Sequence, residues 1–285
     1  MSQIDQNLHC RGVSFAINFQ ATLAKLSLHL GKVIVVLCFT LLSACASLET
    51  KQQVVIGVER IEYYPYWEID AEGELRGFAR ELMDAFSDYA HLDIEYQAYN
   101  VHALYEKFFA GDLDLKLPDN PYWQAEKKSG LPIAYSLPVA GFTDGVLVKH
   151  TRSGQGLSSF GRLGTVKGFT PFAYFPLIES GKIKLTEVQN FNELYAIMAN
   201  DEIDGIYFPE VSAKHYLDNL TINNLANVSL TSDDIMFDPS LPYVHSFYYV
   251  STFTRHDILH QFNSFLIDQE AKIKIMRQRY GIESP

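Results

Sequence analysis

Residues 54–86 read VVIGVERIEYYPYWEIDAEGELRGFARELMDAF. The opening VVIGV is a short apolar run of mostly β-branched side chains, which predicts a strand buried on both faces, as in a parallel sheet. In open α/β sheets, ligands bind outside the carboxyl ends of the strands. This strand is followed there by a loop of five aromatic or proline side chains, Tyr63, Tyr64, Pro65, Tyr66 and Trp67. Two interpretations of the loop follow: a ligand-binding wall, or aromatic packing beneath a neighbouring loop.

An amphipathic helix is predicted directly after Gly77. Phe78, Leu82 and Phe86 recur every fourth residue, so they share one face of that helix. Residues 70–73 (DAEG) supply turn chemistry between the aromatic loop and the helix. The whole stretch therefore predicts a strand, an aromatic loop, a turn and a helix.

These pieces resemble, in their order, the bacterial extracellular solute-binding proteins of family 3, the type that binds polar amino acids. In that family, a Tyr-Pro-Pro-Phe-Glu-Phe loop follows the first strand, and then come an acidic-Gly turn and a Gly-Phe pair before the helix. Residues 64–69 (YPYWEI), 72–75 (EGEL) and 77–78 (GF) occupy those places. The resemblance covers residues 54 to about 281. It implies the α/β fold of type II periplasmic binding proteins, with two lobes joined by two crossing strands, each lobe a mainly parallel sheet flanked by helices.

The composition excludes some classes of partner. The chain has 285 residues, room for two domains, and a formal net charge of −11. Residues 1–45 carry a net charge of +2, so the remainder carries −13, which argues against nucleic acid and anionic membrane surfaces as partners. The glycines of residues 152–161 match neither a dinucleotide-binding nor a phosphate-loop spacing. We expect no cofactor.

The N-terminus predicts export. Two lysines precede the apolar run 33–42, which is too short for a transmembrane helix and typical of a signal peptide. Residues 42–45, Leu-Ser-Ala-Cys, resemble the bacterial lipobox, which implies cleavage before Cys45 and a lipid on its sulfur. A plain secretory signal with a nearby cysteine is the alternative. Cleavage would remove the other two cysteines, so no disulfide is expected. By resemblance to Gram-negative lipoproteins, Ala46 after the cysteine favours the outer membrane.

A second strand and loop add candidate ligand contacts. Residues 113–117 (LDLKL) read as a strand, and Lys116 near its carboxyl end could meet a ligand carboxylate. A structural ion pair of Lys116 with Asp114 or Asp119 is the alternative. The following loop, PDNPYW, brings three more candidates to the same edge: Asp119, Tyr122 and Trp123.

The chain departs from the family at the next position. The family has a Thr-Pro-Glu-Arg segment here, whose Arg pairs with the α-carboxylate of an amino-acid ligand. The equivalent residue is Glu126, so an anion replaces a bidentate cation. Two outcomes remain open: Lys116 replaces the lost cation, or the ligand bears no carboxylate there.

The second half of the chain predicts the other wall of the cleft. Residues 134–150 and 239–251 are expected to form the two crossings. Thr170, after a strand at residues 163–167, is expected to cap a helix that starts at Pro171. The family uses a Gly-Thr-Thr turn here to hold ligand carboxylates, which makes Phe169 and Thr170 candidate contacts.

Two further acidic or metal-like features have alternative interpretations. Residues 203–208 (IDGIYF) resemble the second-lobe strand of the family, after which Glu210 either meets the ligand's ammonium group or opens the next helix. His256 and His260 lie one turn apart in the expected C-terminal helix 256–280. Their spacing resembles a zincin motif with Asp in place of Glu. A third ligand and a catalytic Glu would be needed, so we expect surface histidines.

Together these features predict a signal peptide at residues 1–45, a first lobe at 46–141 and 246–285, and a second lobe at 142–245. The expected function is capture of a small polar ligand between lobes that close by hinge motion. The protein would be a periplasmic, lipid-anchored monomer and not an enzyme, serving an inner-membrane ABC permease. The alternatives are a ligand sensor for a membrane receptor and a dehydratase-like enzyme on the same fold. The candidate ligand-binding residues are Tyr64, Tyr66, Trp67, Lys116, Asp119, Tyr122, Trp123, Glu126, Phe169, Thr170 and Glu210.

Overall fold

The structure, a computed structural model, describes residues 51–61, 63–220, 232–282 and 285. The predicted signal peptide, residues 1–45 with Cys45, lies outside the described residues. No helix in the part of the chain that is described is long and apolar enough to cross a membrane.

Three parallel strands begin the sheet. β1 (Gln52–Glu59) lies between β4 (Leu92–Tyr99) and β5 (Leu115–Asp119) and pairs in parallel with both. Its apolar side chains are buried, as predicted for a central strand. β5 starts two residues later than predicted, because Asp114 accepts the Val55 N–H with its side chain and gives its backbone carbonyl to Thr252. The parallel ladder therefore begins only at Leu115.

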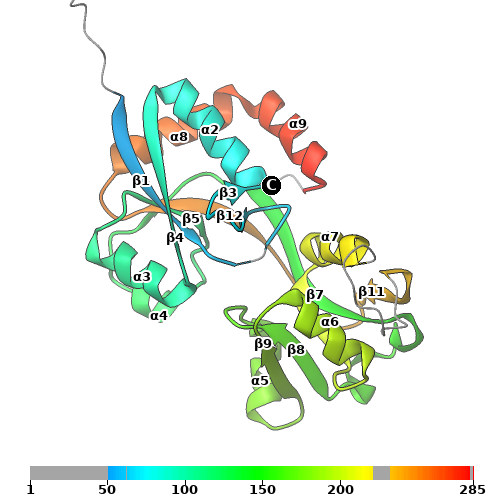
Figure 1. Cartoon of the computed structure of the whole chain (residues 1–285). Coiled ribbons are helices and arrows are strands. Elements are labelled where there is room, and N and C mark those ends of the chain that lie inside the picture. Colours follow the sequence, from blue (N-terminus) through cyan, green and yellow to red (C-terminus); the bar gives the residue numbers. More distant parts are fainter. Residues whose placement is uncertain (1–50, 62, 221–231, 283–284) are drawn as a thin grey trace, which may run out of the picture. The chain divides into compact units, whose positions relative to one another are not determined.

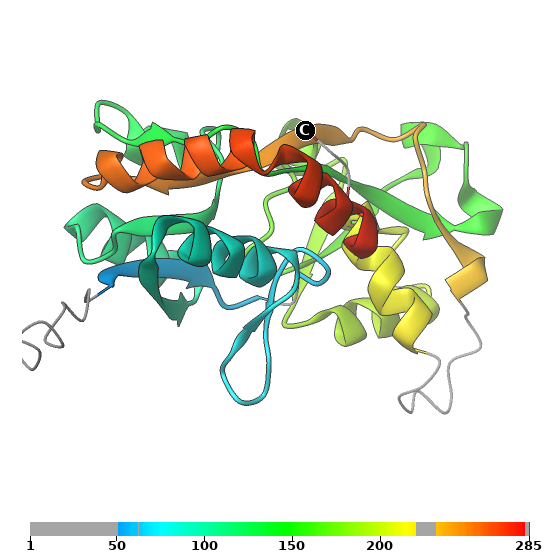
Figure 2. The same cartoon turned by 90° about the horizontal axis from the view of Figure 1, so that it is seen from above.

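Helices on one face of these strands bury the predicted apolar stripe. α2 (Phe78–Ala90), α8 (His256–Asp268) and α9 (Glu270–Tyr280) lie together on that face (Figures 1 and 2). The ring of Phe86 in α2 lies 5.0 Å from that of Phe262 in α8. The predicted helix 256–280 is in fact two helices, because Gln269 ends α8 and caps α9.

α3 (Val101–Ala110) packs with its own apolar cluster of Leu104, Phe108 and Leu113. Asn100 caps its N-terminus, and the helix is followed by Gly111, whose φ of 79° suits glycine. The shorter elements of this half are β2 (Glu68–Ile69), β3 (Leu75–Arg76) and α4 (Ala125–Lys128).

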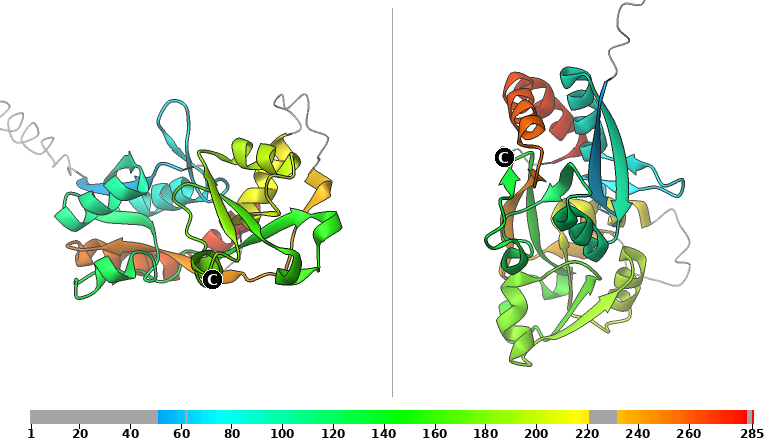
Figure 3. Two further views of the ribbon diagram at one scale, coloured as in Figure 1. Left: turned by 90° about the horizontal axis from the view of Figure 1, so that it is seen from below. Right: turned by 90° about the vertical axis from the view of Figure 1, so that its left-hand side faces the viewer.

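Two antiparallel strands join the two halves of the sheet. β7 (Ala140–Lys149) and β12 (Val244–Thr252) pair with each other, and β12 also pairs with β5 and with β6 (Ala134–Tyr135). Figure 3 shows both strands running from one half to the other. The two predicted crossings are thus confirmed.

The second half repeats the parallel arrangement. β8 (Arg162–Val166) lies between β10 (Gly205–Pro209) and β9 (Lys184–Val188), and β10 pairs with β7. The whole order is β4-β1-β5-β12-β7-β10-β8-β9. The remaining elements are α5 (Phe175–Glu179), α6 (Phe191–Ala199), α7 (Glu210–Leu220), β11 (Ile235–Phe237), and the 3-10 helices η1 (His150–Arg152), η2 (Gly156–Ser159), η3 (Phe172–Tyr174) and η4 (Ser232–Asp234).

We expect Asn100→Ala to lower the free energy of unfolding by about 1 kcal/mol, because it removes the cap of α3. The Asn100 side chain accepts the Ala103 N–H at 2.9 Å. The urea midpoint measures the effect, and Asn100→Asp, which keeps an acceptor oxygen, should restore most of it. Equal losses in both variants would show that the cap is not the cause.

Candidate functional site

A cavity of about 500 Å³ lies where residues of both sheet halves meet. This volume is typical of small-molecule sites. The first half contributes residues from the end of β1, the aromatic loop, α3 and the loop around α4, and the second half contributes Asp144 of β7 and the segment after β8. The lining residues are Glu59, Ile61, Tyr63, Trp67, Val101, Tyr105, Tyr122, Trp123, Gln124, Ala125, Glu126, Lys127, Asp144, Gly168, Phe169, Thr170, Phe172 and Phe175.

The aromatic loop is packed and also reaches the cavity. The Tyr63 ring is stacked between Trp67, at 4.4 Å and 15°, and Phe169 of the second half, at 5.1 Å and 11°. Tyr248 of β12 donates a hydrogen bond to the Tyr63 hydroxyl at 2.8 Å. Tyr63 and Trp67 are almost completely buried, so aromatic packing and the role of a wall coexist in the same side chains.

Two predicted members of the aromatic wall do not line the cavity. Tyr66 is buried and donates its hydroxyl hydrogen bond to the Gly141 carbonyl at 2.9 Å. The Tyr64 ring instead packs against His215 of α7 at 4.2 Å, and the Tyr216 hydroxyl accepts the Tyr64 N–H. Tyr64 therefore joins the two halves outside the cavity.

The second predicted loop forms one rim. Tyr122, Trp123 and Glu126 all line the cavity, as does Lys127. Tyr122 is 76% exposed and Glu126 is also exposed, whereas Trp123 is half-buried. Gln124, in a left-handed conformation with φ 52°, turns the chain into α4 and directs this loop along the rim.

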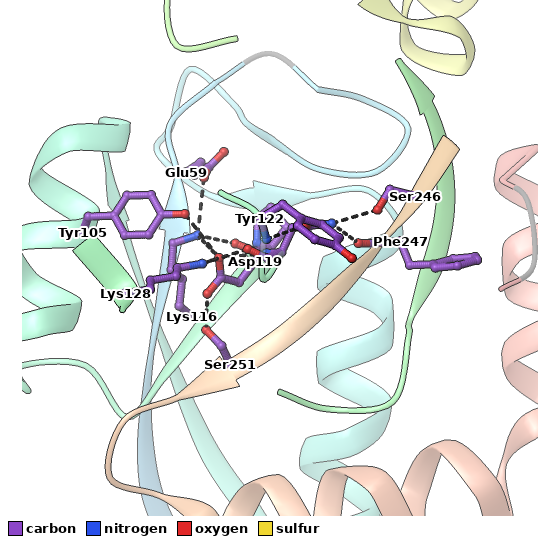
Figure 4. Close-up of polar contacts among 11 residues, drawn as sticks. Glu59, Tyr105, Lys116, Asp119, Tyr122, Lys128, Ser246, Phe247 and Ser251 are labelled. Carbon is purple, nitrogen blue, oxygen red and sulfur yellow. Dashed lines mark hydrogen bonds and ion pairs between the residues drawn. The ribbon is translucent and has the colours of Figure 1, made fainter. Parts of the chain in front are cut away.

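Lys116 and Asp119 lie in a buried charge cluster, and neither of these two residues lines the cavity (Figure 4). The Lys116 ammonium donates to the Pro118 carbonyl at 2.5 Å and lies 3.5 Å from both Glu59 and Asp119. Asp119 accepts hydrogen bonds from Lys128 at 2.6 Å, from Ser251 at 2.6 Å and from Tyr105 at 3.2 Å. Of the two predicted interpretations of Lys116, the structural ion pair is the one present.

The cluster holds its charges in pairs. Burial by itself would raise the pKa of Asp119, but the neighbouring ammonium groups of Lys116 and Lys128 hold that pKa below its ordinary value. Burial raises the pKa of Glu59, and the neighbouring charge of Lys116 offsets only part of that rise. Because both ammonium groups are buried among these partners, neither is exposed to the cavity.

Sequence reasoning missed Asp144, the acid at the centre of the site. Two buried side-chain atoms lack a hydrogen-bond partner within the described part of the chain, Trp67 Nε1 and Asp144 Oδ1, and both residues line the cavity. Burial raises the pKa of Asp144 to about 7. The available signal was a carboxylate in the middle of a crossing strand, between Gly141 and Gly145.

The segment after β8 differs from the prediction. Thr170 lines the cavity, but it does not cap a helix that starts at Pro171. Pro171 itself precedes the 3-10 helix η3, and the Thr170 carbonyl accepts the Phe172 N–H at 2.8 Å. The helical turn begins one residue later than predicted, at Phe172, so Pro171 and not Thr170 occupies its N-cap position. Phe169 lines the cavity as expected.

Glu210 and the two C-terminal histidines lie elsewhere. Glu210 is the first residue of α7, which is one of its two predicted positions, and it is not among the cavity-lining residues. His256 and His260 are exposed on α8, and the described residues contain no group of three potential metal ligands.

No protein-family model matches the chain. A probable histidine-binding protein of Neisseria gonorrhoeae is 23% identical over 173 residues, 59% of this chain. This chain spans only 63% of the length of that relative.

Solved structures share the fold. A histidine kinase sensor domain with similarity to periplasmic binding proteins superposes with a TM-score of 0.65 at 15% identity, over 82% of this chain and 99% of that one. The substrate-binding protein of an ABC uptake transporter from Streptococcus pneumoniae, with bound histidine, gives 0.62 at 18% identity, over 80% and 92%. The fold is therefore that of the two-lobed periplasmic binding proteins, as the sequence resemblance implied.

Proposed function

We propose that this protein is a solute-binding protein that captures a small polar ligand in the cavity between its two sheet halves. The observation that supports this proposal most directly is that both halves contribute to one lining. Trp67 and Trp123 come from the first half, and Phe169 and Thr170 come from the second. A ligand that contacts both halves favours the closed arrangement over an open one. Names of similar proteins, a histidine-binding protein and an ABC substrate-binding protein, support this class of function.

The proposed lobes are residues 46–141 with 246–285, and residues 142–245. Two observations on the described residues support this division. One apolar cluster combines side chains of β1, α2 and α8, whereas two others combine β7, β8 and β10 with α6, α7 and α5. The boundaries at 141/142 and 245/246 fall inside β7 and β12, the two strands that a hinge motion would bend.

Delivery to an inner-membrane ABC permease is the proposed role of the loaded protein, in the periplasm and with a lipid on Cys45 as membrane anchor. The sensory alternative is supported by the similarity to a histidine kinase sensor domain. Deletion of the gene separates the two. Lost uptake of the ligand supports transport, whereas intact uptake with a lost transcriptional response supports signalling.

A binding role without turnover is proposed because the similar proteins carry binding or sensor names. One observation favours a dehydratase-like enzyme as the second candidate: Asp144, with its pKa raised to about 7 by burial, has the property of a general acid or base. Mass spectrometry of the ligand after prolonged incubation with the protein decides, since an unchanged mass excludes loss of water.

The two tryptophans provide a direct test of the binding function. Trp67 and Trp123 are the only two in the sequence, and both line the cavity. We expect a binding solute to change tryptophan emission saturably and to raise the melting temperature, because it binds only the folded state. The panel comprises amino acids, dicarboxylates, polyamines, neutral sugars and short peptides.

One variant locates the signal. Trp123→Phe should keep binding and lose part of the emission change, whereas a solute that raises the melting temperature with no emission change binds elsewhere. If no member of the panel changes either quantity, the proposed function is wrong.

A further inference from the structure

We propose that the cavity selects a cation with N–H donors, an alkylammonium or guanidinium group, with Asp144 as its counter-charge and with no requirement for a ligand carboxylate. This inference deepens the proposed function and rests on it.

Asp144 is placed where three strands meet. In β7 it pairs with Pro209 of β10 and with Val244 of β12. Its neighbours include three buried tyrosines, Tyr63, Tyr207 and Tyr248, whose pKa values are raised first by burial and also by the charge of Asp144. The carboxylate is therefore surrounded by aromatic side chains.

The buried Oδ1 of Asp144 lacks the ion-pair and hydrogen-bond partners that Asp119 has. Asp119 is paired with two lysines, whereas Asp144 forms no ion pair within the described part of the chain, and Oδ1 accepts no hydrogen bond there. Burying a carboxylate without a cation or a donor is costly, and such groups are rare unless they serve a site. A ligand cation that donates an N–H to Oδ1 would supply both the missing counter-charge and the missing hydrogen bond.

Aromatic side chains complete the surroundings of such a cation. Tyr63, Trp67, Trp123 and Phe169 all line the cavity, and the first, second and fourth form one stack. The faces of aromatic rings attract cations, most strongly where water is excluded. A cavity lined by a carboxylate and by aromatic rings favours a positive group over a neutral or negative one.

Among the described residues, the same lining offers no buried cation for a ligand carboxylate. The described lining has three acids, Glu59, Glu126 and Asp144, and one cation, Lys127, which is exposed at the rim. Lys116 and Lys128, the buried cations nearby, are held by Asp119. The carboxylate of an amino acid would therefore remain near the acids without a buried counter-charge, so an amine that lacks it fits better.

The test measures dissociation constants by tryptophan emission and calorimetry, with agmatine, arginine, cadaverine and choline as probes. We expect agmatine or cadaverine to bind, agmatine at least as tightly as arginine, and choline, which has no N–H, at least ten-fold more weakly than the better amine, about 1.4 kcal/mol. Asp144→Asn should weaken amine binding on the order of 100-fold, because a buried charge pair is lost. Asp201→Asn, an exposed acid paired with Lys149, is the matched control and should change nothing.

A second measurement does not depend on a variant. Between pH 5.5 and 8.5 both basic groups of agmatine stay charged and the tyrosines stay uncharged. Amine affinity should therefore rise with pH as Asp144 loses its proton. Glu59, the other buried acid of the lining, is paired with Lys116 and is the remaining group that titrates above its ordinary range. An affinity independent of pH would contradict the role of Asp144.

The outcomes separate this inference from the proposed function. If neutral or anionic solutes bind while the amines do not, if arginine binds more than ten-fold tighter than agmatine, or if Asp144→Asn binds amines unchanged, the inference is overturned and the solute-binding function stands. If no solute of the wider panel binds, the proposed function fails, and this inference with it.

Discussion

Asp119→Ala is expected to lower the free energy of unfolding by about 3–5 kcal/mol, the largest effect of any single change considered for this protein. Asp119 is completely buried and holds two ammonium groups, those of Lys116 and Lys128, at 3.5 and 2.6 Å. Its removal leaves both charges buried with Glu59 as the remaining acid. Urea unfolding at pH 7 measures the loss.

Two comparisons make that result specific. Asp201→Asn removes an exposed acid from a surface pair with Lys149 and should leave the urea midpoint nearly unchanged. The stability difference between wild type and Asp119→Ala should also shrink in acid. The folded pKa of Asp119 is below its unfolded value, so its contribution is complete above that unfolded value and disappears as pH falls through the folded one. A loss below about 1 kcal/mol at pH 7 would mean that the lysines find water or other partners.

Asp144→Asn is expected to raise the free energy of unfolding of the ligand-free protein at pH 8 by about 2–4 kcal/mol. Asp144 has an ordinary pKa of 3.8 and a folded pKa of about 7. Between those values the folded state binds more protons than the unfolded state, so this group lowers stability progressively as pH rises from about 4 to about 7. Asparagine keeps the shape and removes the charge, so the variant should lose this part of the pH dependence.

Asp204→Asn is the matched control, with the opposite sign. Although burial opposes ionisation of Asp204, hydrogen bonds from Arg162 and Gly161 lower its pKa, so the charge stabilises the fold. This variant should be less stable at pH 8, whereas Asp144→Asn should be more stable. If Asp144→Asn is also destabilised, the Asp144 carboxylate has a partner within the protein that stabilises its charge. Asp144 is then not available as the counter-charge of a ligand cation.

The destabilising effect of the Asp144 carboxylate and its proposed role in binding have the same cause. A carboxylate whose buried oxygen has no partner lowers the stability of the empty protein and raises the affinity for a cation that neutralises it. Asp119 and Asp144 are the same type of side chain. The lysines and hydroxyl donors around Asp119 make it a structural acid, whereas Oδ1 of Asp144 has no partner among the described residues.

The local elements could be predicted from the sequence because they depend on neighbours in the chain. The apolar run at β1 and the period of Phe78, Leu82 and Phe86 each specify an element through local geometry. The order of those elements resembles that of the family 3 solute-binding proteins, and this resemblance implied the two-lobed fold. Boundaries failed where a distant residue intervened, as at Asp114, whose carbonyl bonds to Thr252.

The residues of the candidate site were likewise predicted only in part. Trp67, Tyr122, Trp123, Glu126, Phe169 and Thr170 line the cavity, because loops at the carboxyl ends of parallel strands meet at one edge. Tyr64, Tyr66, Lys116, Asp119 and Glu210 have the expected chemistry and do not line it.

The sequence by itself determined that this protein has strands, amphipathic helices and two crossings in the order of a binding fold. Only the tertiary structure decided which charges are satisfied, because an ion pair between Lys116 and Asp119 or Glu59 depends on side-chain directions and on distances between separate strands. For the same reason it alone revealed Asp144. A carboxylate becomes a binding candidate through what surrounds it, and its surroundings come from β10, β12 and the aromatic loop, far away in the chain.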